Sequence, residues 1–370
     1  MWSRFDPGEI DEDFARIAGL GLEVVRFFLL WEAFQPEPGR LDEGAVKRLV
    51  AVLDRLDARG LRAMPTLFTG HMSGVNWLPD WTLDRSTTSG RFRTISRGRT
   101  VPHGIGDFYT GDLLEAQRFF VRSLGERVRE HAAILAWDLG NEFSNLRAPR
   151  TPEDAAHWSA ALSHDLFESS NLPATGGLHG EDLTEERAIR PSSIAEPWLY
   201  ATMHGYPAYS SYARSPDDPE VVPFLYELTS SFAQKRVLFS ELGTPICPEG
   251  ERIVGGFPCL DDAAGAPYAA AVLERLQARG ALGAFWWCWT DYDPELRVVA
   301  PFDEAPHELR FGMIRADGSE RPVTGVLSEL ARRRLPLAEP CAPIADEDAY
   351  YAGLPPSLPQ AYAAYCRRRA

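Results

Sequence analysis

Two glutamates each follow a short apolar run of the sequence. Glu142 follows the run that begins at Ile134 in ILAWDLGNE, and Glu241 ends the run VLFSE. Small or polar neighbours, LGNEF and FSELG, let each carboxylate face an open site. Cleavage of a glycosidic bond needs two converging carboxylates, one to protonate the leaving oxygen and one to stabilise or attack the cationic carbon. The pair predicts this chemistry. The alternative is that both glutamates are turn carboxylates with no catalytic role.

Other polar and aromatic residues also lie within or just after apolar runs. An arginine inside the run VVRFF, Arg26, must be paired if it is buried, and it could hold the nucleophilic carboxylate ionised. The run FWWCW supplies flat faces for a sugar ring, and strand alternation places Trp287 and Trp289 on one side and Trp286 on the other. The remaining candidates, some of which could be satisfied core groups instead, are Trp31, His71, Asn141, His204 and Tyr206.

The elements that must position these residues alternate between short apolar runs and longer helical stretches. This pattern is typical of parallel strands joined by crossover helices. Seven strands are expected, at 23–30, 61–68, 133–139, 172–179, 198–206, 236–243 and 281–292. Helices are expected at 8–21, 42–60, 112–131, 151–170, 218–234, 267–280 and 324–334. A long loop is expected between His71 and Gly111.

The pattern predicts an α/β fold, a (β/α)8 barrel over residues 1–335. Its first strand is short or missing, because only MWSRFD precedes the first helix. Residues 336–370, rich in Pro and Ala, are expected to form a C-terminal extension packed on the barrel. An open sheet would also accept seven strands, but the GxGxxG fingerprint of dinucleotide-binding sheets is absent. Catalytic groups of such barrels lie at the carboxyl ends of the strands. When the short or missing first strand is counted, the strands at 133–139 and 236–243 are the fourth and seventh, and they lie across the barrel from each other. Their ends can therefore bring Glu142 and Glu241 together.

Composition restricts the partners of this chain. Of its 370 residues 45% are hydrophobic and 25% charged, as in a globular protein, and the formal charge of -15 argues against nucleic acid as a partner. We expect a cytoplasmic protein with no membrane partner, because neither a signal-peptide pattern nor a bilayer-length apolar run occurs. The five cysteines are expected to be mostly buried or incidental thiols, with a bridge between Cys247 and Cys259 as the alternative.

Other enzyme chemistries find little support in the motifs. HExxH, P-loop and GxSxG patterns are absent, which argues against zinc proteolysis, nucleotide hydrolysis and serine hydrolase chemistry. The mechanism that the two glutamates suggest requires no metal and no cofactor.

The motifs resemble those of the retaining clan A glycoside hydrolases, and family 5 most of all. The resemblance rests on WDLGNE with Asn141 before Glu142, and on LFSELG with Glu241. Supporting matches are VVRFFLLWEAFQPEPG, the HGY of residues 204–206 and FWWCW. Together these motifs extend over nearly the whole predicted barrel.

The resemblance implies a role for each matched residue. Glu142 would be the general acid/base and Glu241 the nucleophile, with Asn141 bonding the sugar 2-hydroxyl. Arg26 and Tyr206 would orient the nucleophile. His204 would line the site, and Trp287 would form the floor under the reacting sugar.

The expected function is hydrolysis of β-glycosides by double displacement, with an oligosaccharide or small β-glycoside as substrate. Exo action on short oligosaccharides is expected, with β-mannosides first and β-glucosides or β-galactosides next. An endo-β-mannanase, a β-glucanase or a transglycosylase would use the same residues. A non-catalytic carbohydrate-binding barrel is the alternative of another class. The oligomeric state stays open.

Overall fold

The computed structural model describes residues 2, 4–333 and 339–369. The chain divides into two compact units. Unit 1 comprises Met1–Gly177 and Arg187–Leu199, and unit 2 comprises Leu178–Glu186 and Tyr200–Ala370. Each unit is built around a parallel sheet.

The sheet of unit 1 has four parallel strands in the order β1-β2-β9-β10. Their bounds are Val24–Leu30 for β1, Arg62–Thr69 for β2, Trp137–Asp138 for β9 and Ala174–Thr175 for β10. The register sets Thr66 of β2 opposite Asp138 of β9. All but the first residue of β2 are buried, as expected of a parallel strand covered on both faces.

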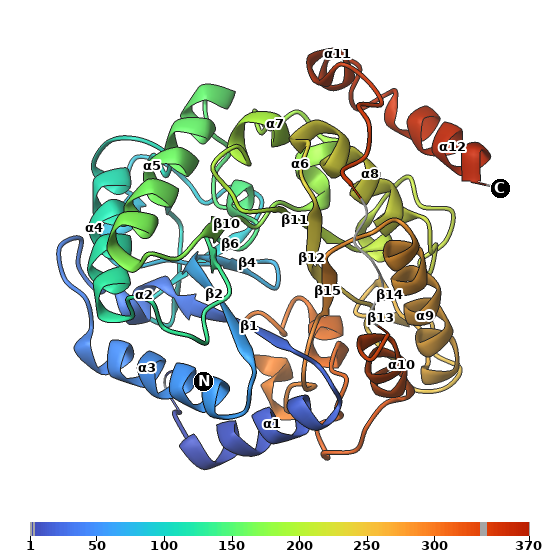
Figure 1. The fold of residues 1–370 in the computed structure, drawn as a ribbon, viewed down its shortest axis with the longest axis horizontal. Coiled ribbons are helices and arrows are strands. Elements are labelled where there is room, and N and C mark those ends of the chain that lie inside the picture. The colour runs from blue at the N-terminus through green and yellow to red at the C-terminus, as the bar shows by residue number, and fades with distance from the viewer. Residues whose placement is uncertain (1, 3, 334–338, 370) are drawn as a thin grey trace. The chain divides into compact units, whose positions relative to one another are not determined.

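Amphipathic helices precede and connect these strands, and Figure 1 shows α1 and α3 side by side. The helices of unit 1 are α1 (Pro7–Gly19), α2 (Trp31–Phe34), α3 (Glu43–Ala58), α4 (Gly111–Arg127), α5 (Pro152–Ser170) and α7 (Pro191–Ile194). The start of α5 follows from its sequence, because Thr151 caps the backbone N–H of Asp154 and Pro152 occupies the first turn. Helix α3 ends just before Gly60, whose φ of 68° suits glycine.

The segment expected as a long loop after β2 forms two small sheets instead. One has the order β3-β4-β6-β7, and the other pairs β5 with β8. The bounds are His71–Met72 (β3), Val75–Trp77 (β4), Leu83–Asp84 (β5), Arg93–Ser96 (β6), Arg99–Val101 (β7) and Gly104–Ile105 (β8), with a 3-10 turn η1 at Asp80–Thr82. Glycines with positive φ, Gly74 and Gly98, make the hairpin turns. Strands this short carry too few residues for a periodic signal, which explains why the sequence indicated only a loop.

The sheet of unit 2 has three parallel strands in the order β11-β12-β15. The strands are β11 (Ala201–Gly205), β12 (Val237–Leu242) and β15 (Gly283–Trp286), and β13 (Ile253–Val254) pairs with β14 (Phe257–Pro258) in a hairpin. The helices are α6 (Gly180–Thr184), α8 (Val221–Ala233), α9 (Asp262–Ala278) and α10 (Pro322–Ala331), and α9 and α10 lie side by side (Figure 1). Short 3-10 turns are η2 (Phe143–Asn145) in unit 1, and η3 (Pro207–Tyr209), η4 (Pro294–Val298) and η5 (Pro306–Arg310) in unit 2.

The end of the chain carries two further helices of unit 2, α11 (Glu347–Ala352) and α12 (Leu358–Arg369), which pack against α8. Every residue of α8 is buried, and aromatic side chains of this tail pack against it: Tyr362 on Phe224 and Tyr350 on Phe232. The boundary expected at 335/336 falls among residues 334–338, which lie outside the described residues. The division into a barrel and an extension therefore stays a prediction.

The described residues contain seven strands in the two parallel sheets, as the sequence predicts. The first barrel strand was expected to be either short, within residues 1–6, or missing. Met1 and Ser3 lie outside the described residues, and the others of that stretch are not assigned to a strand. Trp2 donates from Nε1 to the carbonyl oxygen of Phe28 at 2.6 Å and contacts the Phe34 ring edge-on. Where the structure describes the chain, no helix is long and apolar enough to cross a membrane.

Candidate active site

The predicted site residues lie in both units, and each group is described within its own unit. Unit 1 holds Arg26, Trp31, His71, Asn141 and Glu142. Unit 2 holds His204, Tyr206, Glu241, Trp287 and Trp289.

A buried ion pair anchors the group in unit 1. Arg26 of β1 donates from Nε to Asp138 at 2.9 Å, and Asp138 is fully buried. The same guanidinium donates to the Asn141 side-chain oxygen at 2.9 Å. The Asn141 amide in turn donates to the backbone carbonyl of His71 at 2.9 Å. The residue before Glu142 is thus held from two sides, and Asp138 is the partner that sequence reasoning did not assign.

The backbone at Glu142 is strained. Its φ of 47° and ψ of 46° are left-handed, a conformation that costs a non-glycine residue about 1–2 kcal/mol. Its N–H donates to the Gly177 carbonyl at 3.1 Å. Gly177 has to be glycine, because a Cβ there would overlap the Gly140 carbonyl oxygen. Such strain is typical of functional sites, where the surrounding structure holds it.

The Glu142 carboxylate has two polar neighbours within unit 1. Asn145 donates to Glu142 Oε2 at 3.1 Å, and His71 Nε2 lies 3.7 Å from the same oxygen. His71 is buried, and its Nδ1 lies 2.7 Å from the Asn76 side-chain oxygen. Five-sixths of the Glu142 side chain is buried, with 17% exposed. The sequence singled out His71 without a partner, and the structure sets it beside the predicted acid.

Trp31 takes a different place from the one expected. Its side chain is fully buried and packs edge-on against Phe68, Trp81 and Phe108. Its Nε1 donates to Gln35 at 2.7 Å. A side chain with no exposed surface does not contact a substrate, so Trp31 is corrected from a substrate-binding residue to a core residue.

The group in unit 2 centres on Glu241. Tyr206 donates its hydroxyl to Glu241 Oε1 at 2.5 Å, and His204 Nδ1 lies 3.8 Å from Oε2. The parallel register of β11 and β12 places His204 directly opposite Glu241. Only 8% of Glu241 and 1% of His204 are exposed. The carboxylate that the sequence singled out on β12 therefore lies beside His204 of β11 and accepts from Tyr206, which directly follows β11.

The tryptophans at the end of β15 and just after it separate into buried and partly exposed rings. Trp286 is buried and donates to the Phe311 carbonyl at 3.2 Å, which confirms that at least one of the three serves packing. Trp287 and Trp289 are half-buried. A Cβ at Gly243 would lie 2.6 Å from the Trp287 carbonyl oxygen, so this glycine lets the chain after β15 approach the end of β12.

A further polar cluster in unit 2 was missed by sequence reasoning. The Tyr209 hydroxyl lies 2.8 Å from His307 Nε2 and donates to Glu308 Oε1 at 3.1 Å. Burial lowers the pKa of His307 to about 4, so the ring is neutral at pH 7. The Tyr209 ring also contacts Tyr206, the partner of Glu241. The residues of this cluster come from η3 and η5. The sequence of η5, PHELR, has the composition of a solvated turn and gives no signal of a site.

The Cys247–Cys259 pair forms a disulfide, with a Cα–Cα separation of 5.8 Å. This corrects the expectation of incidental thiols, since the alternative was the right one. The hairpin of β13 and β14 lies within the loop that the bridge closes, which explains why two cysteines twelve residues apart meet. The described cysteines outside this disulfide are Cys288, Cys341 and Cys366, and burial raises the pKa of Cys288.

Solved structures of glycoside hydrolases share the fold of this chain. A variant of GH5_18 from Streptomyces cattleya, in complex with Manβ1-4GlcNAc, matches with a TM-score of 0.78 at 22% identity, over 99% of this chain and 87% of that one. GH5_18 from Bifidobacterium longum subsp. longum, as a variant with the same ligand, matches with a TM-score of 0.73 at 21% identity, over 91% and 76%. An exo-β-1,4-mannosidase from Opitutaceae bacterium strain TAV5 matches with a TM-score of 0.72 at 24% identity, over 90% and 56%.

This likeness establishes the fold. The (β/α)8 barrel predicted from the sequence is confirmed, and it is the fold of the family 5 structures that the motifs resemble. No protein-family model and no curated protein sequence matches the chain.

Proposed function

We propose that this protein is a retaining β-glycoside hydrolase with Glu241 as nucleophile and Glu142 as general acid/base. The observation that carries the proposal is the position of the two glutamates. Glu142 follows β9 and Glu241 lies near the end of β12, at the carboxyl ends of parallel strands. In a barrel of this fold these ends form the catalytic face. The family 5 fold supports the assignment.

The proposed reaction has two steps. In the first, a Glu241 oxygen attacks the anomeric carbon, the bond to the leaving oxygen breaks, and Glu142 gives that oxygen its proton. In the second, Glu142 takes a proton from water, the water oxygen attacks the same carbon, and the bond to Glu241 breaks. Two inversions at one carbon retain the configuration of the released sugar.

The neighbouring side chains support the assignment of Glu241 as nucleophile and Glu142 as general acid/base. Tyr206 and His204 fix the orientation of Glu241, and the strained backbone of Glu142 fixes where its carboxylate points. Asn141, held by Arg26, bonds the 2-hydroxyl of the reacting sugar in our proposal. Trp287 forms the floor under that sugar, with Trp289 beside it, and His71 borders the acid.

We favour exo action on short β-mannosides as the substrate preference. The matched structures support it, because two of them hold Manβ1-4GlcNAc and a third is an exo-β-1,4-mannosidase. The two small sheets between His71 and Gly111 are proposed to wall off one end of the cleft. An endo-acting enzyme or a transglycosylase would use the same carboxylates.

The test is hydrolysis of 4-nitrophenyl β-glycosides of mannose, glucose, galactose, xylose and fucose by the wild type, Glu142→Gln and Glu241→Gln. We expect turnover of the mannoside, and a fall in kcat of about a thousandfold or more in Glu241→Gln because the covalent step is lost. The surface variant Glu43→Gln is the control. If no sugar is turned over while mannotetraose still binds, either the site needs a longer chain or the protein is a carbohydrate-binding barrel rather than an enzyme.

The cytoplasmic location expected from the sequence stays a prediction. The Cys247–Cys259 disulfide does not favour it, because stable disulfides are typical of oxidising compartments. Labelling of free thiols in the native host before and after reduction tests it. A cytoplasmic protein should react at both cysteines without added reductant.

A further inference from the structure

Unit 2 contains a cavity that none of the candidate catalytic residues lines. It has a volume of about 670 Å³, within the range of ligand sites in proteins. Its walls come from the segments that follow β12 and β15 and from η5 and the turn before α10. Glu241 lies on the first of these strands, and Trp287 directly follows the second. The cavity therefore lies on loops at the same ends of these strands as the proposed nucleophile.

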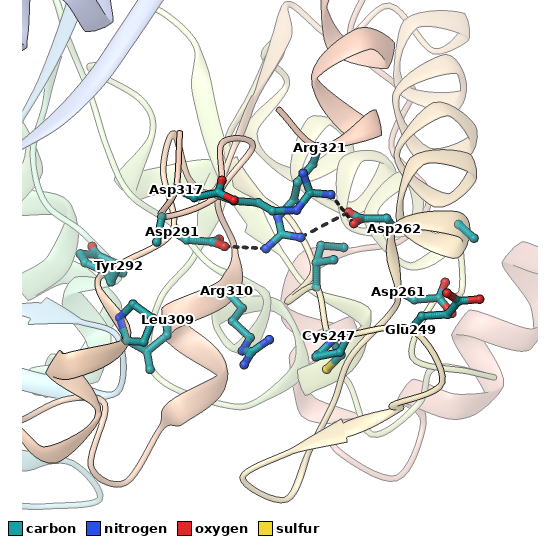
Figure 2. A pocket seen from close by; sticks show the side chains of 16 residues that line it. Cys247, Glu249, Asp261, Asp262, Asp291, Tyr292, Leu309, Arg310, Asp317 and Arg321 are labelled. Atoms are coloured by element: carbon teal, nitrogen blue, oxygen red, sulfur yellow. Dashed lines mark hydrogen bonds and ion pairs between the residues drawn. The ribbon is translucent and has the colours of Figure 1, made fainter. Parts of the chain in front are cut away.

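Most of the charged groups in the wall are already paired. Arg321 binds Asp291 at 2.5 Å and Asp262 at 3.3 Å, and Arg315 binds Asp262 at 2.6 Å. Figure 2 shows Arg321 between the two aspartates. Next to Asp262, Asp261 caps α9, and Arg252 lies 3.3 Å from it. These pairs make the wall of the cavity polar.

Among the guanidinium groups of the wall, Arg310 is the exception. It is half-buried at the end of η5, and its backbone carbonyl accepts from the N–H of Ile246, which fixes the residue in place. Within the part of the chain that the structure describes, its guanidinium makes no hydrogen bond and no ion pair. Figure 2 shows the side chain extending into the space near Cys247, with no dashed line reaching it. A half-buried guanidinium with five unused donors is suited to a ligand that carries acceptors.

We propose that this cavity is a sugar-binding subsite, in which Arg310 donates to hydroxyl oxygens of a sugar unit beyond the one that reacts. The inference rests on the proposed function and adds to it the recognition of a longer oligosaccharide. It names a specificity residue of unit 2, outside the catalytic group.

The charges of the wall select a neutral saccharide over an anion. Five carboxylates and three guanidinium groups line the cavity, so the local charge is negative and repels a carboxylate or phosphate. Sugar hydroxyls both accept and donate, and they can take donors from Arg310 while they donate to carboxylates such as Glu249. The half-buried Tyr292 adds an aromatic face to the same wall.

The test compares Arg310→Met, which keeps an unbranched chain but removes the donors, with the wild type. Arg297→Met, an exposed arginine of η4, is the matched control. The two substrates are 4-nitrophenyl β-mannoside, which fills one sugar position, and β-1,4-mannotetraose. We expect kcat/KM for the tetraose to fall about tenfold in Arg310→Met, while the value for the aryl mannoside stays within about twofold. Arg310→Lys should recover part of the loss, because it restores one donor group without the planar fork.

Equal losses on both substrates, or no loss on either, would overturn the subsite. If the wild type hydrolyses neither of these substrates nor any other glycoside of the panel, the proposed function fails, and titration calorimetry with mannotetraose still tests the cavity. Weaker binding by Arg310→Met than by Arg297→Met then supports the subsite, and equal affinities refute it. Inorganic phosphate that binds more tightly than mannotetraose in an Arg310-dependent way would refute the assignment to a neutral sugar.

Discussion

At the residue scale, the ion pair of Arg26 with Asp138 connects folding to the proposed chemistry. Asp138 is fully buried, and its Oδ2 also accepts from Thr66 at 2.8 Å. Arg26, held by Asp138, donates a hydrogen bond to Asn141, the residue directly before Glu142. Removal of one partner of a buried pair leaves the other charge without compensation, which costs far more than the loss of a surface pair.

We therefore expect Asp138→Asn to lower the free energy of unfolding by about 3–5 kcal/mol. Glu43→Gln is the control, because it breaks an exposed pair with Arg127 and should cost at most about 1 kcal/mol. Urea unfolding followed by circular dichroism measures both. Equal, small losses in the two variants would show that Arg26 does not depend on Asp138.

The site residues that the sequence indicated are those next to apolar runs. Glu142 and Glu241 were predicted because a carboxylate that follows a buried strand is unusual. Asp138 was not assigned as the partner of Arg26, because 112 residues separate the two and no local pattern connects them. Glu308 was missed for another reason. It lies in a short polar turn, and only the fold buries it beside Tyr209.

At the element scale, long periodic segments were predicted well and short ones were not. Helix α5 was expected over 151–170 and is observed at Pro152–Ser170. Its N-cap residue and its periodic buried face both indicate the same helix. Strand β9 has two residues where seven were expected. A strand shows as a long apolar run even where only part of it pairs with neighbours. The hairpins after β2 depend on tertiary pairing of strands two to four residues long.

The bridged loop between β12 and α9 gives the prediction at this scale. The Cys247–Cys259 disulfide closes a loop with a sequence separation of 12. We expect Cys247→Ala with Cys259→Ala to lower the free energy of unfolding by about 3 kcal/mol, because the unfolded chain regains the freedom that the bridge removed.

Thermal unfolding with and without dithiothreitol measures this effect, and Cys366→Ala is the control. The double variant should unfold at the same temperature in both conditions. The wild type should lose stability only when reduced. If reductant leaves the wild type unchanged, the bridge does not contribute to stability.

At the scale of the whole molecule, the fold was predicted from the alternation of strands and helices, and comparison with solved structures confirms it. The tail was recognised as Pro- and Ala-rich, but its helices α11 and α12 were not predicted. Their apolar face is aromatic, and Tyr351, Tyr362 and Tyr365 become buried only against other parts of unit 2. Such burial depends on a partner surface that the sequence does not reveal.

Global stability should depend on pH through His307. Its pKa is about 4 in the folded chain and about 6.5 in the unfolded chain, so the unfolded state binds the proton more readily. This contribution to stability is complete above pH 6.5 and is lost as the pH falls toward 4, by about 3 kcal/mol at most. His307→Gln should remove this part of the pH dependence, whereas exposed His157→Gln should keep it.

Urea unfolding at pH 7, 5.5 and 4 measures the difference between each variant and the wild type. The gap between wild type and His307→Gln should narrow as the pH falls. A gap that is constant across this range would contradict a buried neutral histidine.

The central claim is that Glu241 forms a covalent bond with the sugar. Its most direct measurement is incubation with 2-deoxy-2-fluoro-β-mannosyl fluoride, followed by proteolysis and mass spectrometry. The good leaving group speeds the first step, and the 2-fluorine slows both steps by destabilising the cationic transition state. We expect the fluorosugar on the peptide that contains Glu241, and no label in Glu241→Gln. Label on another carboxylate, or turnover of mannosides with inversion and no label at all, would contradict the account.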